Sequence, residues 1–146
     1  LDDVLSLHAA DAEQKRIRLD VTCEECPPIL ADPGHIKQLW TNLISNAIKY
    51  TPEGGSVRVH LRPEAGEVVG DVEDTGIGIG PDDLPRLFEE FFRTEQAKAF
   101  AQYGTGLGLS IVRQIVTECG GDIQVKSEVS RGTRFTFRLP AAPAPA

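Results

Sequence analysis

The sequence has no apolar stretch that approaches the roughly 18 residues needed for a membrane-spanning helix. Its first residues also lack the basic and then apolar pattern of a secretory signal. Both absences predict a soluble domain without direct membrane contact. A longer parent protein with its own membrane anchor is compatible with this prediction.

Basic residues are also scarce relative to acidic ones: 15 Lys and Arg stand against 22 Asp and Glu, giving a net charge of −7. Nucleic-acid binding usually depends on clustered Lys and Arg, so we expect no DNA or RNA partner. The hydrophobic share of 40% and the charged share of 25% are those of an ordinary globular protein. A chain of 146 residues is long enough for one domain with one core.

Only three cysteines are present, and an odd number does not indicate a disulfide framework. Cys23 and Cys26 form a C-x-x-C pair, but no second pair completes a four-ligand zinc site and no helix follows as in a redox motif. We interpret these cysteines as ordinary thiols, with a metal or redox role as the less favoured alternative. They fit a reducing, cytoplasmic location.

The clearest periodicity predicts a helix from about residue 34 to residue 50. Asp32 and Pro33 form its predicted start, because Asp is a favoured N-cap and Pro loses no hydrogen bond in the first turn. One side of this helix is apolar and carries Ile36, Leu39, Trp40, Leu43, Ile44, Ala47 and Ile48. The opposite side carries Gln38, Asn42, Asn46 and Lys49.

The rest of the chain shows strand and helix patterns in an irregular order. Strands are predicted at residues 17–21, 29–31, 56–61, 67–73, 122–127 and 133–139. Further helices are predicted at about residues 4–16 and at 108–119, and a short helix is predicted to begin at residue 81. Residues 91–103 are predicted to be a mobile connector, and the Pro/Ala-rich residues 141–146 a disordered tail. This order indicates an α+β two-layer sandwich, with helices on one face of a sheet.

A first candidate site comprises Asn42, Asn46 and Lys49, which are spaced to lie on one face of the predicted helix. Side-chain amide oxygens suit Mg²⁺ beside a phosphate chain, and an ammonium group adds positive charge for the phosphates. On this helix alone, a solvated polar face is the favoured interpretation.

A second candidate, Asp74–Gly80, directly follows a predicted strand and contains three alternating glycines. A carboxylate at a strand end can accept a hydrogen bond from an exocyclic amine, and glycines let the backbone approach a flat ligand. A tight turn with a capping aspartate is an equally open interpretation, although three glycines are many for a turn.

A third candidate, Gly104–Ser110, opens the last predicted helix. The free N–H groups of a glycine-rich helix start can bind phosphates, and a hinge is the alternative. The spacing meets neither the G-x-G-x-x-G of dinucleotide-binding proteins nor the G-x-x-x-x-G-K-[ST] of P-loop proteins. A nucleotide site here requires a different fold.

Together these segments resemble the catalytic domains of sensor histidine kinases, within the wider group that includes gyrase, Hsp90 and MutL. The resemblance rests on an N box at residues 42–52, a G1 box at 74–78, an F box at 87–93, a G2 box at 104–109 and a closing G-T-x-F at 132–135. It spans residues 1–140, which we expect to form one catalytic domain. It implies a Bergerat fold, in which three helices cover one face of a mixed, mainly antiparallel sheet of about five strands, with a mobile ATP lid.

The resemblance implies ATP and Mg²⁺ as cofactors. Asn46 would hold Mg²⁺ through its amide oxygen with Asn42 assisting, and Lys49 and Arg93 would contact the phosphates. These four side chains are the catalytic residues that it implies. Residues 91–103 would form the lid, with Gly104, Gly106 and Gly108 at its hinge. The G2 residues that would complete the nucleotide site are Gly104, Thr105, Gly106, Leu107, Gly108 and Leu109.

For the base, the resemblance implies that Asp74 accepts a hydrogen bond from the adenine amine. Guanine carries a carbonyl at the same position, so Asp74 would select adenine. Thr133 would reach the base edge through water. Gly76 and Gly78 would let the base lie against the loop. Tyr50 would line the nucleotide pocket, and Ile79 is a further implied nucleotide-binding residue.

Relatives that hydrolyse ATP carry a Glu four residues before the magnesium Asn, as a base that activates water. Here that position is Asn42, whose amide cannot accept a proton, so the resemblance implies slow hydrolysis and transfer to a histidine instead. His8, His35 and His60 lack the acceptor motif, and we expect structural or surface roles for them.

The acceptor is therefore expected outside this chain, on its own or a cognate dimerisation and histidine-phosphotransfer domain. A response regulator is the expected partner of the full-length kinase. Since dimerisation in such kinases lies in the acceptor helices, this chain alone is expected to be monomeric.

Two alternatives stay open. A serine-directed kinase of the same fold would carry the E-x-x-x-N pattern that Asn42 interrupts. An ATP-binding sensing or scaffold module without kinase activity is favoured by Glu90, which stands where many relatives carry Arg, and by the missing acceptor. The intact Asn46, Asp74 and glycine loops count against a loss of nucleotide binding.

Overall fold

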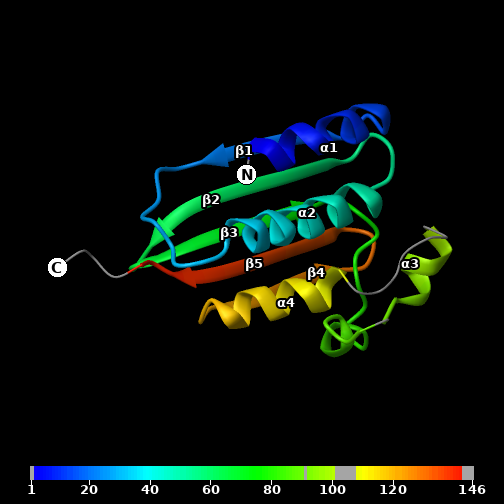
Figure 1. Cartoon of the computed structure of the whole chain (residues 1–146). Coiled ribbons are helices and arrows are strands. Elements are labelled where there is room, and N and C mark those ends of the chain that lie inside the picture. The colour runs from blue at the N-terminus through cyan, green and yellow to red at the C-terminus, as the bar shows by residue number, and fades with distance from the viewer. Residues whose placement is uncertain (1, 91, 101–107, 143–146) are drawn as a thin grey trace.

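The computed structural model describes residues 2–90, 92–100 and 108–142, which form a five-stranded sheet with helices on one face (Figure 1). The strands are β1 (Arg18–Cys23), β2 (Ser56–Glu64), β3 (Glu67–Asp74), β4 (Asp122–Glu128) and β5 (Gly132–Pro140). Their order is β1-β2-β3-β5-β4, with β1 and β2 parallel and the other three pairs antiparallel. This arrangement confirms the predicted α+β two-layer sandwich.

Three helices cover one face of the sheet: α1 (Asp2–Gln14), α2 (Pro33–Lys49) and α4 (Gly108–Glu118) (Figure 1). A short 3-10 helix, η1 (Leu84–Arg86), follows β3, and its Leu84 packs against the core. A short α-helix, α3 (Glu95–Phe100), lies beyond one end of the sheet (Figure 1). Among the described elements, none covers the opposite face of the sheet, which we call the open face. No helix within the described ranges has the length and apolar character needed to cross a membrane.

Helix α2 lies between α1 and α4 in the covering layer (Figure 1). Its N-cap is Asp32, whose carboxylate accepts a hydrogen bond from the Gly34 N–H at 2.8 Å, and Pro33 occupies the first turn as predicted. The predicted apolar face is also the buried one, with Leu39, Trp40, Leu43, Ile44, Ala47 and Ile48. Burial of each large apolar side chain stabilises the fold by about 1.5–3 kcal/mol, so this face fixes the helix on the sheet.

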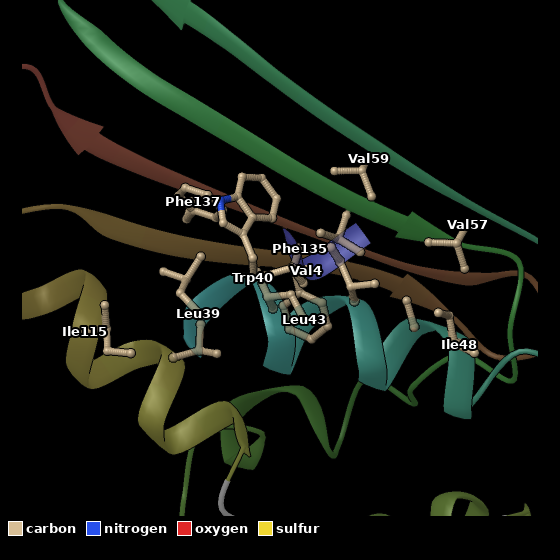
Figure 2. Close-up of a cluster of buried hydrophobic side chains, with 14 of the residues drawn as sticks. Val4, Leu39, Trp40, Leu43, Ile48, Val57, Val59, Ile115, Phe135 and Phe137 are labelled. Atoms are coloured by element: carbon tan, nitrogen blue, oxygen red, sulfur yellow. The ribbon is translucent and has the colours of Figure 1, made fainter. Parts of the chain in front are cut away.

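The core lies between α2 and the strands β2, β3 and β5 (Figure 2). The Trp40 ring meets the Phe137 ring edge-on, with centroids 5.0 Å apart and planes at 72°. Val57 and Val59 of β2 and Phe135 of β5 extend the same layer of side chains. Because these contacts fix α2 against the sheet, they also fix the end of α2 relative to the end of β3.

The predicted strand at 29–31 is not formed: Ile29 makes one isolated bridge to Ala141 instead. The preceding Pro27 and Pro28 have no N–H to donate, so a longer ladder cannot begin there. The Ala141 N–H donates a hydrogen bond to the Gly66 carbonyl at 3.1 Å, and the Ala142 N–H donates to the Pro28 carbonyl at 2.8 Å. The first two residues of the predicted disordered tail are therefore hydrogen-bonded, while residues 143–146 lie outside the described part.

The predicted connector at 91–103 contains helix α3, so the prediction of an irregular segment is wrong for residues 95–100. Thr94 begins this helix, since its hydroxyl accepts the Ala97 N–H at 2.9 Å. The helix contains Glu, Gln, Ala and Lys, which have high helix propensity, and this preference outweighs the weak apolar pattern. Residues 91 and 101–103 are outside the described ranges.

Candidate functional site

A cavity of about 250 Å³ lies beside the C-terminal half of α2 and the segment that follows β3. We call that segment, residues 74–80, the G1 loop. The segment around Arg93, the start of α4 and the start of β5 complete the walls. The predicted site residues that line the cavity are Asn42, Asn46, Lys49, Tyr50, Asp74, Gly78, Ile79, Arg93, Gly108, Leu109 and Thr133. Residues far apart in the sequence thus converge on one space.

Helix α2 brings Asn42, Asn46 and Lys49 to the cavity, as their spacing predicts, whereas the exposed Gln38 does not line it. The Asn42 Nδ2 atom is buried and has no hydrogen-bond partner among the described residues. Gly108 lies close by, since a Cβ there would stand 3.8 Å from the Asn42 amide oxygen. A buried donor without an acceptor costs about 1–3 kcal/mol, so this position suits an incoming acceptor such as a phosphate oxygen.

Two cations flank Tyr50 at the end of α2. The Lys49 ammonium lies 5.3 Å from the centroid of the Tyr50 ring, a cation–π arrangement. The Arg93 guanidinium donates to the Tyr50 hydroxyl and to the Ala97 carbonyl of α3, both at 3.4 Å. Positive charge from the helix and from the segment before α3 therefore meets at one wall of the cavity.

Asp74 is the last residue of β3, and it is only 9% exposed. Its Oδ1 atom accepts the Gly76 N–H at 2.9 Å and the Thr133 N–H at 3.3 Å. Within the described residues, no hydrogen bond reaches Oδ2. Burial raises the pKa of Asp74 from 3.8 to about 6, against the lowering effect of the two N–H donors. At neutral pH the cavity thus contains a carboxylate oxygen that can accept a hydrogen bond from a ligand.

The G1 loop is held between the end of α2 and the turn that joins β4 to β5. A Cβ on Gly76 would overlap the Tyr50 carbonyl oxygen, which accepts the Ile77 N–H at 3.1 Å. Gly78 has a φ of +73°, and a Cβ there would overlap the Glu128 carbonyl oxygen. Glycine is therefore required at both positions for the loop to lie this close to its neighbours.

Seven further residues line the cavity that were not predicted, and all but Thr94 are apolar. They are Ala47, Ile77, Leu87, Phe92, Thr94, Ala97 and Phe135. Five of them lie inside matched motifs, which was the available signal: Ala47, Ile77, Leu87, Phe92 and Phe135. Ser127 of β4, which supports the G1 loop by accepting the Ile79 N–H at 2.8 Å, carried no such signal.

Other predicted residues lie away from the cavity or outside the described ranges. Gly76 does not line the cavity, although its N–H holds Asp74. Glu90 is exposed. Gly104, Thr105, Gly106 and Leu107 fall outside the described residues, so their assignments stay predictions.

The three histidines do not line the cavity. His8 is mostly buried, with Nδ1 3.8 Å from Asp11, while His35 is exposed and the His60 Nε2 lies 2.7 Å from Glu24. The three cysteines are free thiols. The described side chains contain no group of three or more His, Cys, Asp or Glu that could hold a metal ion.

Residues 31–143 match the family of histidine kinase-, DNA gyrase B- and HSP90-like ATPases. The sensor-like histidine kinase SenX3 of Mycolicibacterium smegmatis is 36% identical over 145 residues, which are 99% of this chain and 38% of SenX3. Full-length ShkA in complex with AMPPNP has a TM-score of 0.84 at 35% identity, over 99% of this chain and 30% of ShkA. The histidine kinase ThkA, in complex with the response regulator protein TrrA, has a TM-score of 0.77 at 27% identity, over 97% of this chain and 39% of ThkA.

This chain therefore spans well under half the length of these relatives. The family match nevertheless covers most of the chain, and the fold agrees with that of ShkA along nearly all of it. The chain belongs to the family of histidine kinase-, DNA gyrase B- and HSP90-like ATPases, and it has the form of the catalytic, ATP-binding domain of a sensor histidine kinase.

Proposed function

We propose that this domain binds ATP with Mg²⁺ and presents the γ-phosphoryl group to a histidine on a dimerisation domain of its own or a cognate chain. The observation that carries the proposal is the arrangement of the cavity. A buried carboxylate, Asp74, lines one part of it, and the amides and ammonium of Asn42, Asn46 and Lys49 line another. These groups match the two ends of ATP, a base with an exocyclic amine and a chain of phosphates.

At the base, the Oδ2 of Asp74, to which no described residue donates a hydrogen bond, is the acceptor for the adenine amine. The apolar side chains of Ile77, Ile79 and Leu109 contribute apolar contact surface for the flat ring of a purine. A 6-oxo purine would place a carbonyl oxygen against the carboxylate, and two acceptors repel each other. The pocket therefore favours adenine over guanine.

At the phosphates, Lys49 and Arg93 supply positive charge and Asn42 supplies a buried N–H donor. The residues also fit Mg²⁺, because the amide oxygen of Asn46, with Asn42 assisting, can join phosphate oxygens in an all-oxygen ligand set. When bound, Mg²⁺ would neutralise charge on the phosphates. Asn46 would hold the ion and Lys49 would orient the phosphate chain.

The side chain at position 42 supports transfer to a histidine rather than to water. An amide cannot accept the proton of an attacking water, so Asn42 provides no general base. ThkA has been solved with the response regulator TrrA, and we infer a response regulator as the downstream partner of the parent kinase. We place the domain in the cytoplasm, where ATP and such a partner are available.

The first experiment is calorimetric titration of this chain with ATP and with GTP, each with and without Mg²⁺. We expect ATP to bind at least about 100-fold more tightly than GTP, because the wrong base leaves buried polar groups unpaired. Binding of neither nucleotide would contradict the proposal. ATP binding without transfer of labelled phosphate to the dimerisation domain of the parent kinase would instead favour a sensing or scaffold module.

Asn46→Asp tests the magnesium assignment, because it replaces a neutral ligand with a charged one. The dependence of ATP affinity on Mg²⁺ concentration should change in this variant. Gln38→Glu is the matched control, since it adds the same charge to an exposed position of the same helix. An Asn46→Asp titration that matches wild type would remove Asn46 from the metal site.

A further inference from the structure

Helix α2 ends beside the cavity, at the residues that the proposed function assigns to the phosphates. The last carbonyls of a helix have no N–H partner within that helix, so other groups must donate to them. The Ala47 carbonyl accepts the Thr51 hydroxyl at 2.6 Å. The Ile48 and Lys49 carbonyls both accept from the ammonium of Lys15, at 2.9 and 3.1 Å. Lys15 therefore caps the end of α2 from outside the helix.

Lys15 lies in the turn that joins α1 to β1. Its own carbonyl accepts the Gly54 N–H at 3.3 Å, in the turn that follows α2. The backbone and the side chain of Lys15 therefore both hold the segment at the end of α2. Burial lowers the pKa of the Lys15 ammonium below the ordinary 10.5, because it removes water from the charged group. The two carbonyls of α2 take the place of part of that water.

Lys49 is the last residue of α2, and its side chain lines the cavity. Its ammonium lies 5.3 Å from the centroid of the Tyr50 ring. A lysine in the last turn of a helix can also donate to the last carbonyls of its own helix. Here Lys15 already donates to the Ile48 and Lys49 carbonyls. The Lys49 ammonium is therefore available to a ligand in the cavity.

We propose that Lys15 is a positioning residue that caps the end of α2 and thereby keeps the Lys49 ammonium available for the phosphates of ATP. The inference rests on the proposed nucleotide site and adds a residue from outside it. Lys15 does not itself line the cavity, so it acts through Lys49. Without Lys15, two carbonyls at the negative end of the helix dipole would compete with the phosphates for the Lys49 ammonium.

The test compares ATP with adenosine, which carries the same base but no phosphates. Lys15→Met removes the ammonium and keeps most of the aliphatic chain. We expect the dissociation constant for Mg-ATP in calorimetry to rise about tenfold, the size of one hydrogen bond from a charged donor. The dissociation constant for adenosine, measured by NMR titration, should rise less than about twofold. Lys15→Arg keeps a charged donor for both carbonyls and should restore the wild-type ratio of the two constants.

A merely structural role for Lys15 predicts a different result. A general loosening of the fold would weaken ATP and adenosine equally, which leaves the ratio unchanged. Arg16→Met is the matched control, because it removes the same charge from the next residue, whose exposed side chain pairs with Glu53 at 3.6 Å. It should leave both dissociation constants unchanged, which separates the cap from the loss of one positive charge.

The outcomes separate the inference from the proposed function. A wild-type chain that binds neither ATP nor adenosine overturns both. A wild-type chain that binds ATP, together with an unchanged ratio of the two constants in Lys15→Met, overturns the inference alone. If Lys15→Met does not fold, Lys15→Gln carries the same test, because the glutamine amide is neutral and its chain is one bond shorter.

Discussion

Strand β3 carries two buried aspartates three residues apart, and each lies opposite a threonine of β5. Asp71 pairs in register with Thr136 on the open face, and Asp74 pairs with Thr133 on the helix-covered face. The two pairs share the same strands and the same residue types. They differ in what surrounds the carboxylate, and that difference separates a structural group from the proposed binding group.

On the open face, Asp71 is fully engaged. Its Oδ1 accepts the Thr136 hydroxyl at 2.6 Å, and its Oδ2 accepts from Arg62 and from Arg134, the latter at 3.1 Å. The side chain is only 7% exposed although no helix covers it, because the arginines lie over it. Burial alone would raise the pKa of Asp71, but the hydrogen bonds from Thr136 and the arginines hold it below the ordinary 3.8.

On the covered face, no side chain among the described residues hydrogen-bonds to Asp74. Backbone N–H groups reach one of its oxygens, and its pKa is raised to about 6 because burial dominates. The Thr133 hydroxyl, which could have satisfied it as Thr136 satisfies Asp71, bonds to Ser127 instead. A carboxylate left without side-chain partners in a cavity is in the state that a ligand amine can complete.

The largest expected effect is on stability, from Asp71→Ala. Arg62 and Arg134 lose their shared partner, so we expect the free energy of unfolding in urea to fall by about 3 kcal/mol. The affinity for ATP should not change, because the site is on the other face. Asp20→Ala is the control: it removes an exposed ion pair with Arg18 on the same face and should cost less than about 1 kcal/mol. Equal losses in the two variants would contradict the structural role of Asp71.

Asp74→Asn should show the reverse pattern. The amide cannot accept at both positions, so the affinity for ATP should fall about 100-fold in calorimetry, equivalent to about 2.7 kcal/mol. Stability at neutral pH should not fall, because the buried ionised carboxylate is itself unfavourable. Glu73→Gln changes the neighbouring exposed carboxylate in the same way and should leave the affinity unchanged. ATP affinity that survives Asp74→Asn would remove Asp74 from the base site.

The two aspartates should also act in different pH windows. The folded pKa of Asp74 is raised, so its contribution to stability is present below about pH 4 and is lost as the pH rises through about 6. The folded pKa of Asp71 is lowered, so its contribution is present above about pH 4 and is lost as the pH falls further.

Urea unfolding at a series of pH values tests this. Relative to wild type, Asp74→Asn should gain about 2 kcal/mol between about pH 4 and pH 7. The deficit of Asp71→Ala should stay constant over that range and shrink only at lower pH. A gain of Asp74→Asn that does not depend on pH would show that its pKa is not raised.

The sequence predicted the parts of the fold whose signals are local. Helix α2 has an N-cap, a proline in its first turn and a long apolar face, so its bounds were predicted to within one residue. Helix α3 was not predicted, because residues 95–100 lack a clear apolar face. The helix propensity of its residues and the Thr94 cap determine its formation instead. The strand at residue 29 was predicted from three apolar residues, but pairing depends on a partner that only the folded chain supplies.

The site residues also separate into those with a local sequence signal and those whose surroundings form only in the folded chain. Helical spacing placed Asn42 and Asn46 on one face, and the strand-end position drew attention to Asp74. Nothing in the alternation of β3 distinguished Asp71 from a solvated polar residue, because its burial depends on arginines of β2 and β5. Ser127 likewise reads as one polar residue of a strand until the G1 loop is folded against it.

The smallest expected effects come from the two threonines, and they compare the faces most directly. Thr136→Val removes one hydrogen bond to Asp71 and should lower the free energy of unfolding by about 1 kcal/mol, with no change in ATP affinity. Thr133→Val keeps the backbone bond to Asp74 but removes the hydroxyl at the cavity, so ATP affinity should fall about fivefold, while the lost bond to Ser127 should lower the free energy of unfolding by about 1 kcal/mol. Both variants remove the same atoms from the same strand, so each controls for the other. If Thr136→Val weakens ATP binding as much as Thr133→Val does, the two faces of the sheet are coupled, and the open face contributes to the site as well as to stability.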